Sequence, residues 1–114
     1  MRFLRSLYTI PAHLSNVSDI RFFHANNLYH KLPETEGDGN YTKEEWGYRS
    51  GLFFASSGYD GLVKIWSADD WQLLRTLTTD AGKVMSVDVS SDGNHIASGT
   101  YNRNFQLFAP EEVV

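Results

Sequence analysis

Residues 55–66 of this chain have the sequence ASSGYDGLVKIW, and residues 97–108 have the related sequence ASGTYNRNFQLF. Three pairs of residues keep the same offset of 42 positions: Ser56 with Ser98, Asp60 with Asn102, and Trp66 with Phe108. In the first stretch a tight-turn sequence at 59–61 precedes a run of alternating apolar and polar residues, as in a β-hairpin. A repeat of this length indicates structural units that bury their faces by packing on one another.

The same alternation predicts strands on both sides of the two stretches. Turns are expected at 59–61 and at 90–93, where Asp and Gly stand together. Eight strands are predicted, at 5–10, 18–23, 52–56, 63–66, 72–77, 83–89, 95–98 and 105–108. This succession of short strands and turns favours an all-β fold.

The front of the chain follows the repeat once an insertion is allowed for. Residues 77–84 match residues 10–17 at an offset of 67, which exceeds the repeat period of 42 by 25 positions. The excess falls between two predicted strands, at about 27–51. Its middle, 34–40, is polar, acidic and rich in Gly, so this part is expected to be disordered. Nearby, Trp46 and Tyr48 either pack back on the strands or contact a partner.

A period of about 40–45 residues with Ser, Asp and Trp at these places resembles the WD40 repeats, which form the blades of β-propellers. The resemblance implies a propeller fragment of about two four-stranded antiparallel blades. Because two blades cannot close a ring, we expect the chain to be the C-terminal part of a larger propeller. The expected units are the outer strand of a preceding blade (1–10), a blade with the long insert (11–77), three strands of a final blade (78–108) and a tail (109–114).

In WD40 repeats four residues form a structural hydrogen-bond network, and the first blade contains all four types: His13, Ser56, Asp60 and Trp66. We expect Asp60 to accept from one imidazole nitrogen of His13, and the other nitrogen to bond the hydroxyl of Ser56. That hydroxyl accepts from the indole N–H of Trp66. Ser, His and Asp together also suggest a hydrolase, but Ser56 is engaged by Trp66 and nothing supplies a substrate cleft. No catalytic residues are therefore assigned, and we expect a protein that is not an enzyme.

The second blade departs from this pattern. Asp80 stands at the His position, Asn102 at the Asp position and Phe108 at the Trp position, so only Ser98 remains. Phe108 can fill an apolar slot but has no N–H to donate. This blade is expected to be the weaker one, and Met85 is expected in the core. Its stability should rest on apolar packing by Val84, Val87, Ile96, Phe105 and Leu107.

Composition excludes several kinds of site. The 114 residues contain no Cys, which excludes disulfides and thiolate metal ligands. His24, His30 and His95 have no metal-ligand spacing, so neither a metal nor a cofactor is expected. The formal net charge of −4 argues against extensive contact with nucleic-acid phosphates. No apolar run reaches the roughly 18–20 residues of a membrane span, so no membrane partner is expected, and we expect no small-molecule substrate either.

A narrower resemblance is carried by residues 82–93, GKVMSVDVSSDG, and by residues 101–107, YNRNFQL. These stretches resemble the last blade of the WD-repeat subunits of the spliceosomal U4/U6 small nuclear ribonucleoprotein. The resemblance implies a non-enzymatic nuclear scaffold of the U4/U6 and tri-snRNP particles in pre-mRNA splicing. Its partners would be other proteins of the U4/U6 particle, with the U4/U6 RNA reached through them. The alternative is a WD40 adaptor of another complex, such as a substrate receptor in a ubiquitin ligase.

The residue before the turn Asp projects onto one rim of a WD propeller, where partners commonly dock. Here these residues are Tyr59 and Tyr101, and Arg103 is expected close by. Tyr and Arg are favoured at interface hot spots. The alternative is that both tyrosines only cover the ends of strands. The candidate protein contacts are Tyr59, Tyr101 and Arg103, with Trp46 and Tyr48 of the insert.

Overall fold

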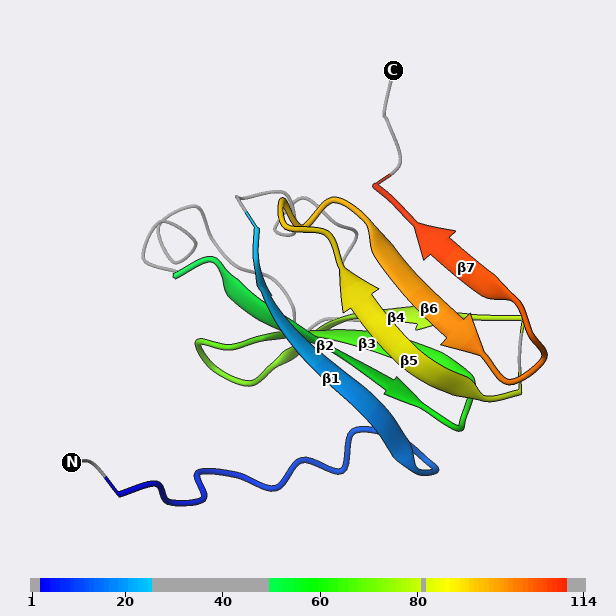
Figure 1. The fold of residues 1–114 in the computed structure, drawn as a ribbon. Coiled ribbons are helices and arrows are strands. Elements are labelled where there is room, and N and C mark those ends of the chain that lie inside the picture. Colours follow the sequence, from blue (N-terminus) through cyan, green and yellow to red (C-terminus); the bar gives the residue numbers. More distant parts are fainter. Residues whose placement is uncertain (1–2, 26–49, 81, 111–114) are drawn as a thin grey trace.

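A computed structural model describes residues 3–25, 50–80 and 82–110. These residues form seven strands and no helix, which confirms the all-β class. The strands build two antiparallel sheets, one of four strands and one of three (Figure 1). Most of the insert at 27–51, including residues 34–40, Trp46 and Tyr48, lies outside the described residues, as do the last four residues of the tail.

The first sheet contains β1 (Val17–His24), β2 (Leu52–Gly58), β3 (Leu62–Ser67) and β4 (Leu73–Thr78), in that spatial order. β1 therefore pairs with β2 across the insert, with Phe22 opposite Phe54. The turn between β2 and β3 is closed by Gly61, whose φ of 83° favours glycine. These strands are the four that the repeat places in the first blade.

The second sheet contains β5 (Val84–Val89), β6 (Ile96–Thr100) and β7 (Phe105–Phe108), in sequence order. A turn of local hydrogen bonds joins β5 to β6. The carboxylate of Asp92 accepts from the hydroxyl of Ser90 and from the N–H of Asn94. Gly93 completes this turn with a φ of 76°. Side-chain bonds of this kind explain why the sequence predicts this turn directly.

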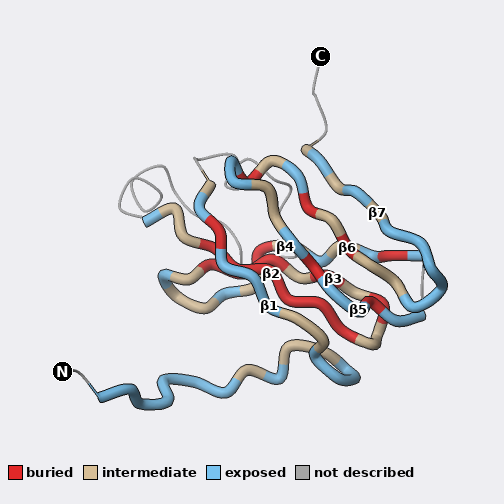
Figure 2. Tube along the Cα trace, in the orientation of Figure 1, coloured by how far each residue is buried: buried red, intermediate tan, exposed pale blue. Residues whose placement is uncertain are grey.

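The core lies between the two sheets, where β5 packs across β1 and β2 (Figure 2). Polar contacts also join the sheets. The hydroxyl of Ser18 donates to the carbonyl of Val84 at 2.6 Å, and Asp19 accepts the N–H of Val87 at 3.3 Å. The buried hydrophobic residues of the core are Phe23, Phe53, Ala55, Val63, Ile65, Leu74, Val84, Val87 and Ile96.

Three packing expectations for the second sheet are wrong. Phe105 and Leu107 are 73% and 63% exposed, and Met85 is 43% exposed. Side chains alternate along β7, so Phe108 packs against the core while Phe105 and Leu107 point to the opposite face. The described residues place no second layer on that face. Val84, Val87 and Ile96, in contrast, are buried as expected.

The segment expected as an outer strand at 5–10 has no strand assignment. A strand forms only beside a ladder partner, and the described residues place none next to this segment. The segment still lies beside the loop between β3 and β4, because the ring of Tyr8 is 6.0 Å from that of Trp71. The blade and tail boundaries stay a prediction.

Candidate functional site

The structure places His13, Ser56, Asp60 and Trp66 in one chain of hydrogen bonds. Nδ1 of His13 lies 3.0 Å from Oδ1 of Asp60 and, because a carboxylate only accepts, donates to it. Nε2 lies 2.8 Å from Oγ of Ser56, and the indole N–H of Trp66 donates to that Oγ at 2.9 Å. In the neutral imidazole the Ser56 hydroxyl donates to Nε2. Every polar side-chain atom of these four residues then has a hydrogen-bond partner.

The local structure explains how these side chains meet. Ser56 and Trp66 lie on the same face of neighbouring strands β2 and β3, and Asp60 lies in the turn that joins those strands. His13 comes from the segment before β1. Its side chain has no exposed surface, and that of Asp60 is 7% exposed. The network therefore fastens the chain before β1 to the turn between β2 and β3.

Asp60 also accepts two backbone hydrogen bonds, from the N–H of Leu14 at 3.0 Å and from that of Leu62 at 3.2 Å. Burial by itself raises the pKa of Asp60. The two N–H groups and the His13 ring favour the charged carboxylate, and together they hold the pKa below its ordinary value of 3.8. Asp60 is thus a charged acceptor for three donors.

Gly58 is a residue of this site that the sequence reasoning missed. A Cβ at Gly58 would lie 2.6 Å from the His13 ring and 2.7 Å from the carboxylate of Asp60. Any side chain there would displace the imidazole from its acceptor. The signal in the sequence is the glycine two positions before Asp60. Why a glycine is needed there becomes clear only from the position of the His13 ring.

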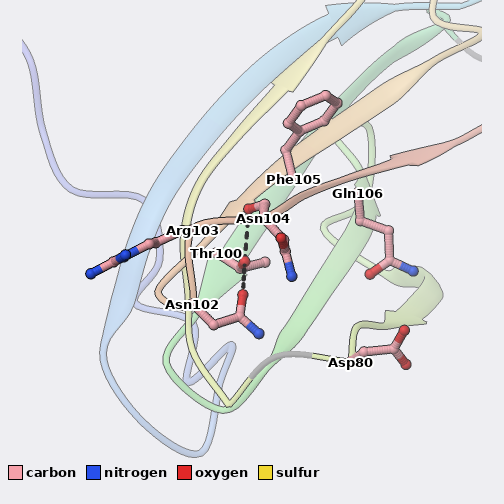
Figure 3. Close-up of a pocket in the computed structure, with 7 residues that line it drawn as sticks. All are labelled: Asp80, Thr100, Asn102, Arg103, Asn104, Phe105 and Gln106. Atoms are coloured by element: carbon pink, nitrogen blue, oxygen red, sulfur yellow. Dashed lines mark hydrogen bonds between the residues drawn. The ribbon is translucent and has the colours of Figure 1, made fainter.

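The described residues of the second blade form no such chain of hydrogen bonds. Oγ of Ser98 is buried and has no hydrogen-bond partner among the described residues. Phe108 offers no N–H, and Asn102 instead receives a hydrogen bond from the hydroxyl of Thr100. The turn between β6 and β7 borders a shallow hollow of about 390 Å³ (Figure 3). The hollow is lined by Asp80, Thr100, Asn102, Arg103, Asn104, Phe105 and Gln106.

The structure brings together Tyr59 and Tyr101, which lie in the hairpin turns of different sheets. Nζ of Lys83 lies 5.2 Å from the centroid of the Tyr59 ring and 5.4 Å from that of Tyr101. Lys83 was not predicted, because only the packing of β5 against β2 places it between the two rings. Arg103 lies in the same turn as Tyr101 and is exposed, whereas Trp46 and Tyr48 lie outside the described residues. We call Tyr59, Lys83, Tyr101 and Arg103 the rim cluster.

Other kinds of site find no support in the described ranges. Within 3–25, 50–80 and 82–110, no group of three or more His, Cys, Asp and Glu side chains is arranged to hold a metal ion. In the same part of the chain, no helix has the length and apolar character needed to cross a membrane.

Comparison with known proteins gives one matching family model and several partial relatives. The model described as "WD domain, G-beta repeat" matches residues 38–67 and 71–108. A U4/U6 small nuclear ribonucleoprotein PRP4-like protein of Arabidopsis thaliana is 35% identical over 60 residues, covering 53% of this chain and 11% of that protein. U4/U6 small nuclear ribonucleoprotein PRP4 of Saccharomyces cerevisiae is 29% identical over 68 residues. That alignment covers 60% of this chain and 14% of the yeast protein.

A relative with a different name matches a shorter stretch more closely. Apoptotic protease-activating factor 1 of Danio rerio is 44% identical over 48 residues, covering 42% of this chain and 4% of that protein. The chain thus aligns with only a small part of the length of each of these three relatives.

Proposed function

Because this chain belongs to the WD40 family of G-beta repeat proteins, we propose that it is a non-enzymatic scaffold that acts through protein contacts. Ser56 supports this proposal, since the residue is 1% exposed and its hydroxyl is hydrogen-bonded to His13 and Trp66. The network therefore has no nucleophile that a substrate can reach. A hydrolytic activity of the folded chain that is lost in Ser56→Ala would contradict the proposal.

We further propose that the protein is a nuclear component of the U4/U6 and tri-snRNP particles in pre-mRNA splicing. The observation that carries this is the similarity to two proteins named as U4/U6 small nuclear ribonucleoproteins, over 53% and 60% of the chain. Other proteins of the U4/U6 particle would bind it directly. The net charge of −4 supports indirect contact with the RNA.

The test is RNA sequencing of what co-precipitates with the tagged full-length protein from nuclear extract. Enrichment of U4 and U6 RNA together is expected. Ultraviolet crosslinking in the same extract should attach little RNA to the tagged protein itself, because its partners carry the RNA. Absence of both RNAs, with the protein folded and soluble, would contradict the splicing role.

Because one relative, apoptotic protease-activating factor 1, is not named as a U4/U6 component, a WD40 adaptor of another complex is a second candidate function. A substrate receptor of a ubiquitin ligase is one example. Mass spectrometry of the same precipitate separates the two functions. The adaptor predicts subunits of a different assembly and neither U4 nor U6 RNA.

A further inference from the structure

The ammonium group of Lys83 lies between the two tyrosine rings of the rim cluster, at 5.2 Å and 5.4 Å from their centroids. The two rings orient the lysine and hold its charge at the surface through cation–π attraction. The backbone supports this placement, since the N–H of Tyr101 donates to the carbonyl of Lys83 at 3.1 Å. The result is a positioned cation, with Tyr101 beside it 70% exposed.

A second observation comes from the backbone of Arg103. Its φ is 75°, a left-handed conformation that is costly for residues with a Cβ. The equivalent position of the first blade, 42 residues earlier, is Gly61 with a φ of 83°, where the conformation carries no such cost. A long charged side chain thus stands in the second blade where glycine would suit the turn. Strain retained at an exposed Arg points to a use for its guanidinium.

Neither cation is neutralised within the described part of the chain. The ion pairs found there are His13 with Asp60 and Arg21 with Asp19, and neither involves Lys83 or Arg103. Asp80 lines the same hollow as Arg103, but the Arg103 side chain points away from the Asp80 carboxylate (Figure 3). Asp60, beside Tyr59, is held by His13 and by two backbone N–H groups. The rim cluster therefore presents two positive charges that have no carboxylate partner among residues 3–25, 50–80 and 82–110.

We propose that the rim cluster binds an acidic protein segment, whose carboxylates pair with Lys83 and Arg103. The proposal rests on the scaffold function proposed above and adds the chemical class of its partner. Arg forms bidentate hydrogen bonds with carboxylates, and the tyrosine hydroxyls can bond the same groups. Single-stranded RNA fits less well, because Lys83 lies over the tyrosine rings on which bases would stack.

Fluorescence anisotropy of the full-length protein with labelled peptides tests this class. The probe is a peptide of about ten residues with alternating Glu and Ser, and its control replaces every Glu by Gln. We expect the Glu peptide to bind, and to bind more weakly as salt is raised, because salt screens exposed charges. Lys83→Met and Arg103→Gly should each weaken binding about tenfold, whereas Arg5→Met, outside the rim cluster, should not.

Urea unfolding of Arg103→Gly separates lost binding from lost folding. Glycine adopts a positive φ without strain, so this variant should be at least as stable as the original protein while it binds the Glu peptide less well. Equal affinity for the Glu and Gln peptides, or unchanged affinity in both variants, would overturn the proposal. So would tighter binding of a single-stranded RNA of similar length that is lost in Lys83→Met.

The peptide-binding experiment and the RNA co-precipitation experiment can fail independently of each other. Co-precipitation of U4 and U6 RNA without Glu-peptide binding would overturn the rim proposal and leave the splicing role standing. Glu-peptide binding that depends on Lys83 and Arg103, without either RNA, would support the rim proposal and contradict the splicing role.

Discussion

The hydroxyl of Ser56 links two neighbours, the imidazole of His13 and the indole of Trp66, at 2.8 Å and 2.9 Å. The equivalent hydroxyl of Ser98 has the same burial but no hydrogen-bond partner among the described residues. A buried polar group that has partners contributes to stability, whereas one without partners has a net cost. The same residue type therefore has opposite effects in the two blades.

This contrast predicts the outcome of a matched pair of substitutions. Ser56→Ala leaves Nε2 of His13 and the Trp66 indole unpaired, and should lower the free energy of unfolding by about 1–3 kcal/mol. Ser98→Ala removes an unpartnered hydroxyl and should leave the stability unchanged or raise it. Urea unfolding of both variants of the full-length protein measures the difference. Equal losses in the two would contradict the network argument.

Asp60 gives a second prediction, on pH. Since its pKa is lowered on folding, its stabilisation is fully present above its ordinary value of 3.8 and is lost as pH falls through the lowered value. Asp60→Asn should therefore be less stable at neutral pH and lose less stability below about pH 4. Asn102→Ala, at the equivalent position without a carboxylate, is the control and should keep the original pH dependence.

Unfolding midpoints between neutral and acidic pH check this prediction. Some acid dependence should remain in Asp60→Asn, because the hydroxyl of Ser90 and the N–H of Asn94 also lower the pKa of Asp92. An unchanged pH profile in Asp60→Asn would show that the carboxylate does not contribute.

At the scale of elements, β7 shows how one strand divides its side chains between two environments. Phe108 packs against the core, while Phe105 and Leu107 on the other face are exposed. Phe108 opposes Ile96, as Trp66 opposes Phe54 in the first sheet. The register therefore places the Phe108 ring at the position that the Trp66 indole has in the first blade. Phe108 is related to Ser98 in the pairing of β6 with β7 as Trp66 is to Ser56 in the pairing of β2 with β3.

Phe108→Trp should consequently supply the missing donor of the second blade. The indole N–H would hydrogen-bond Oγ of Ser98 and raise the free energy of unfolding by about 1 kcal/mol. A double-mutant cycle isolates this effect, because the gain should vanish in a Ser98→Ala background. A gain of equal size in both backgrounds would instead mean that the larger ring fills space.

At the scale of the whole molecule, the two outer sheet faces carry apolar side chains without cover in the described residues. Ile20 and Phe22 are 50% and 62% exposed on β1, and Phe105 and Leu107 are exposed on β7. The repeat relates β7 to β3, where Val63 and Ile65 are buried because the second sheet packs over them. The exposed faces thus have the pattern of inter-blade surfaces.

The 114-residue chain on its own is therefore expected to self-associate through these faces. Analytical ultracentrifugation should show species larger than the monomer, shifting toward the monomer when Phe105 and Leu107 are both changed to Lys. Leu4→Lys with Leu14→Lys is the matched control, since these residues are also exposed but lie outside the strands. A monomer at all concentrations would contradict the expectation.

Much of the fold was predictable from local pattern. The seven observed strands correspond to predicted ones, because alternation and turn residues act over a few positions. The strand expected at 5–10 did not form, since a strand depends on a neighbour that local pattern cannot supply. The exposure of Met85 and Phe105 was also missed, because the repeat predicts which residues share a face but not whether a layer covers it.

The sequence by itself determined the repeat period, the succession of strands along the chain and the identities of the network residues, because the repeat and its resemblance to WD40 repeats carry this information. Only the tertiary structure decided which side chains from the two sheets come into contact. The packing of β5 on β1 and β2 brings Lys83 between Tyr59 and Tyr101, and it lets the hydroxyl of Ser18 donate to the carbonyl of Val84. These contacts join residues far apart in the chain, so no local spacing encodes them.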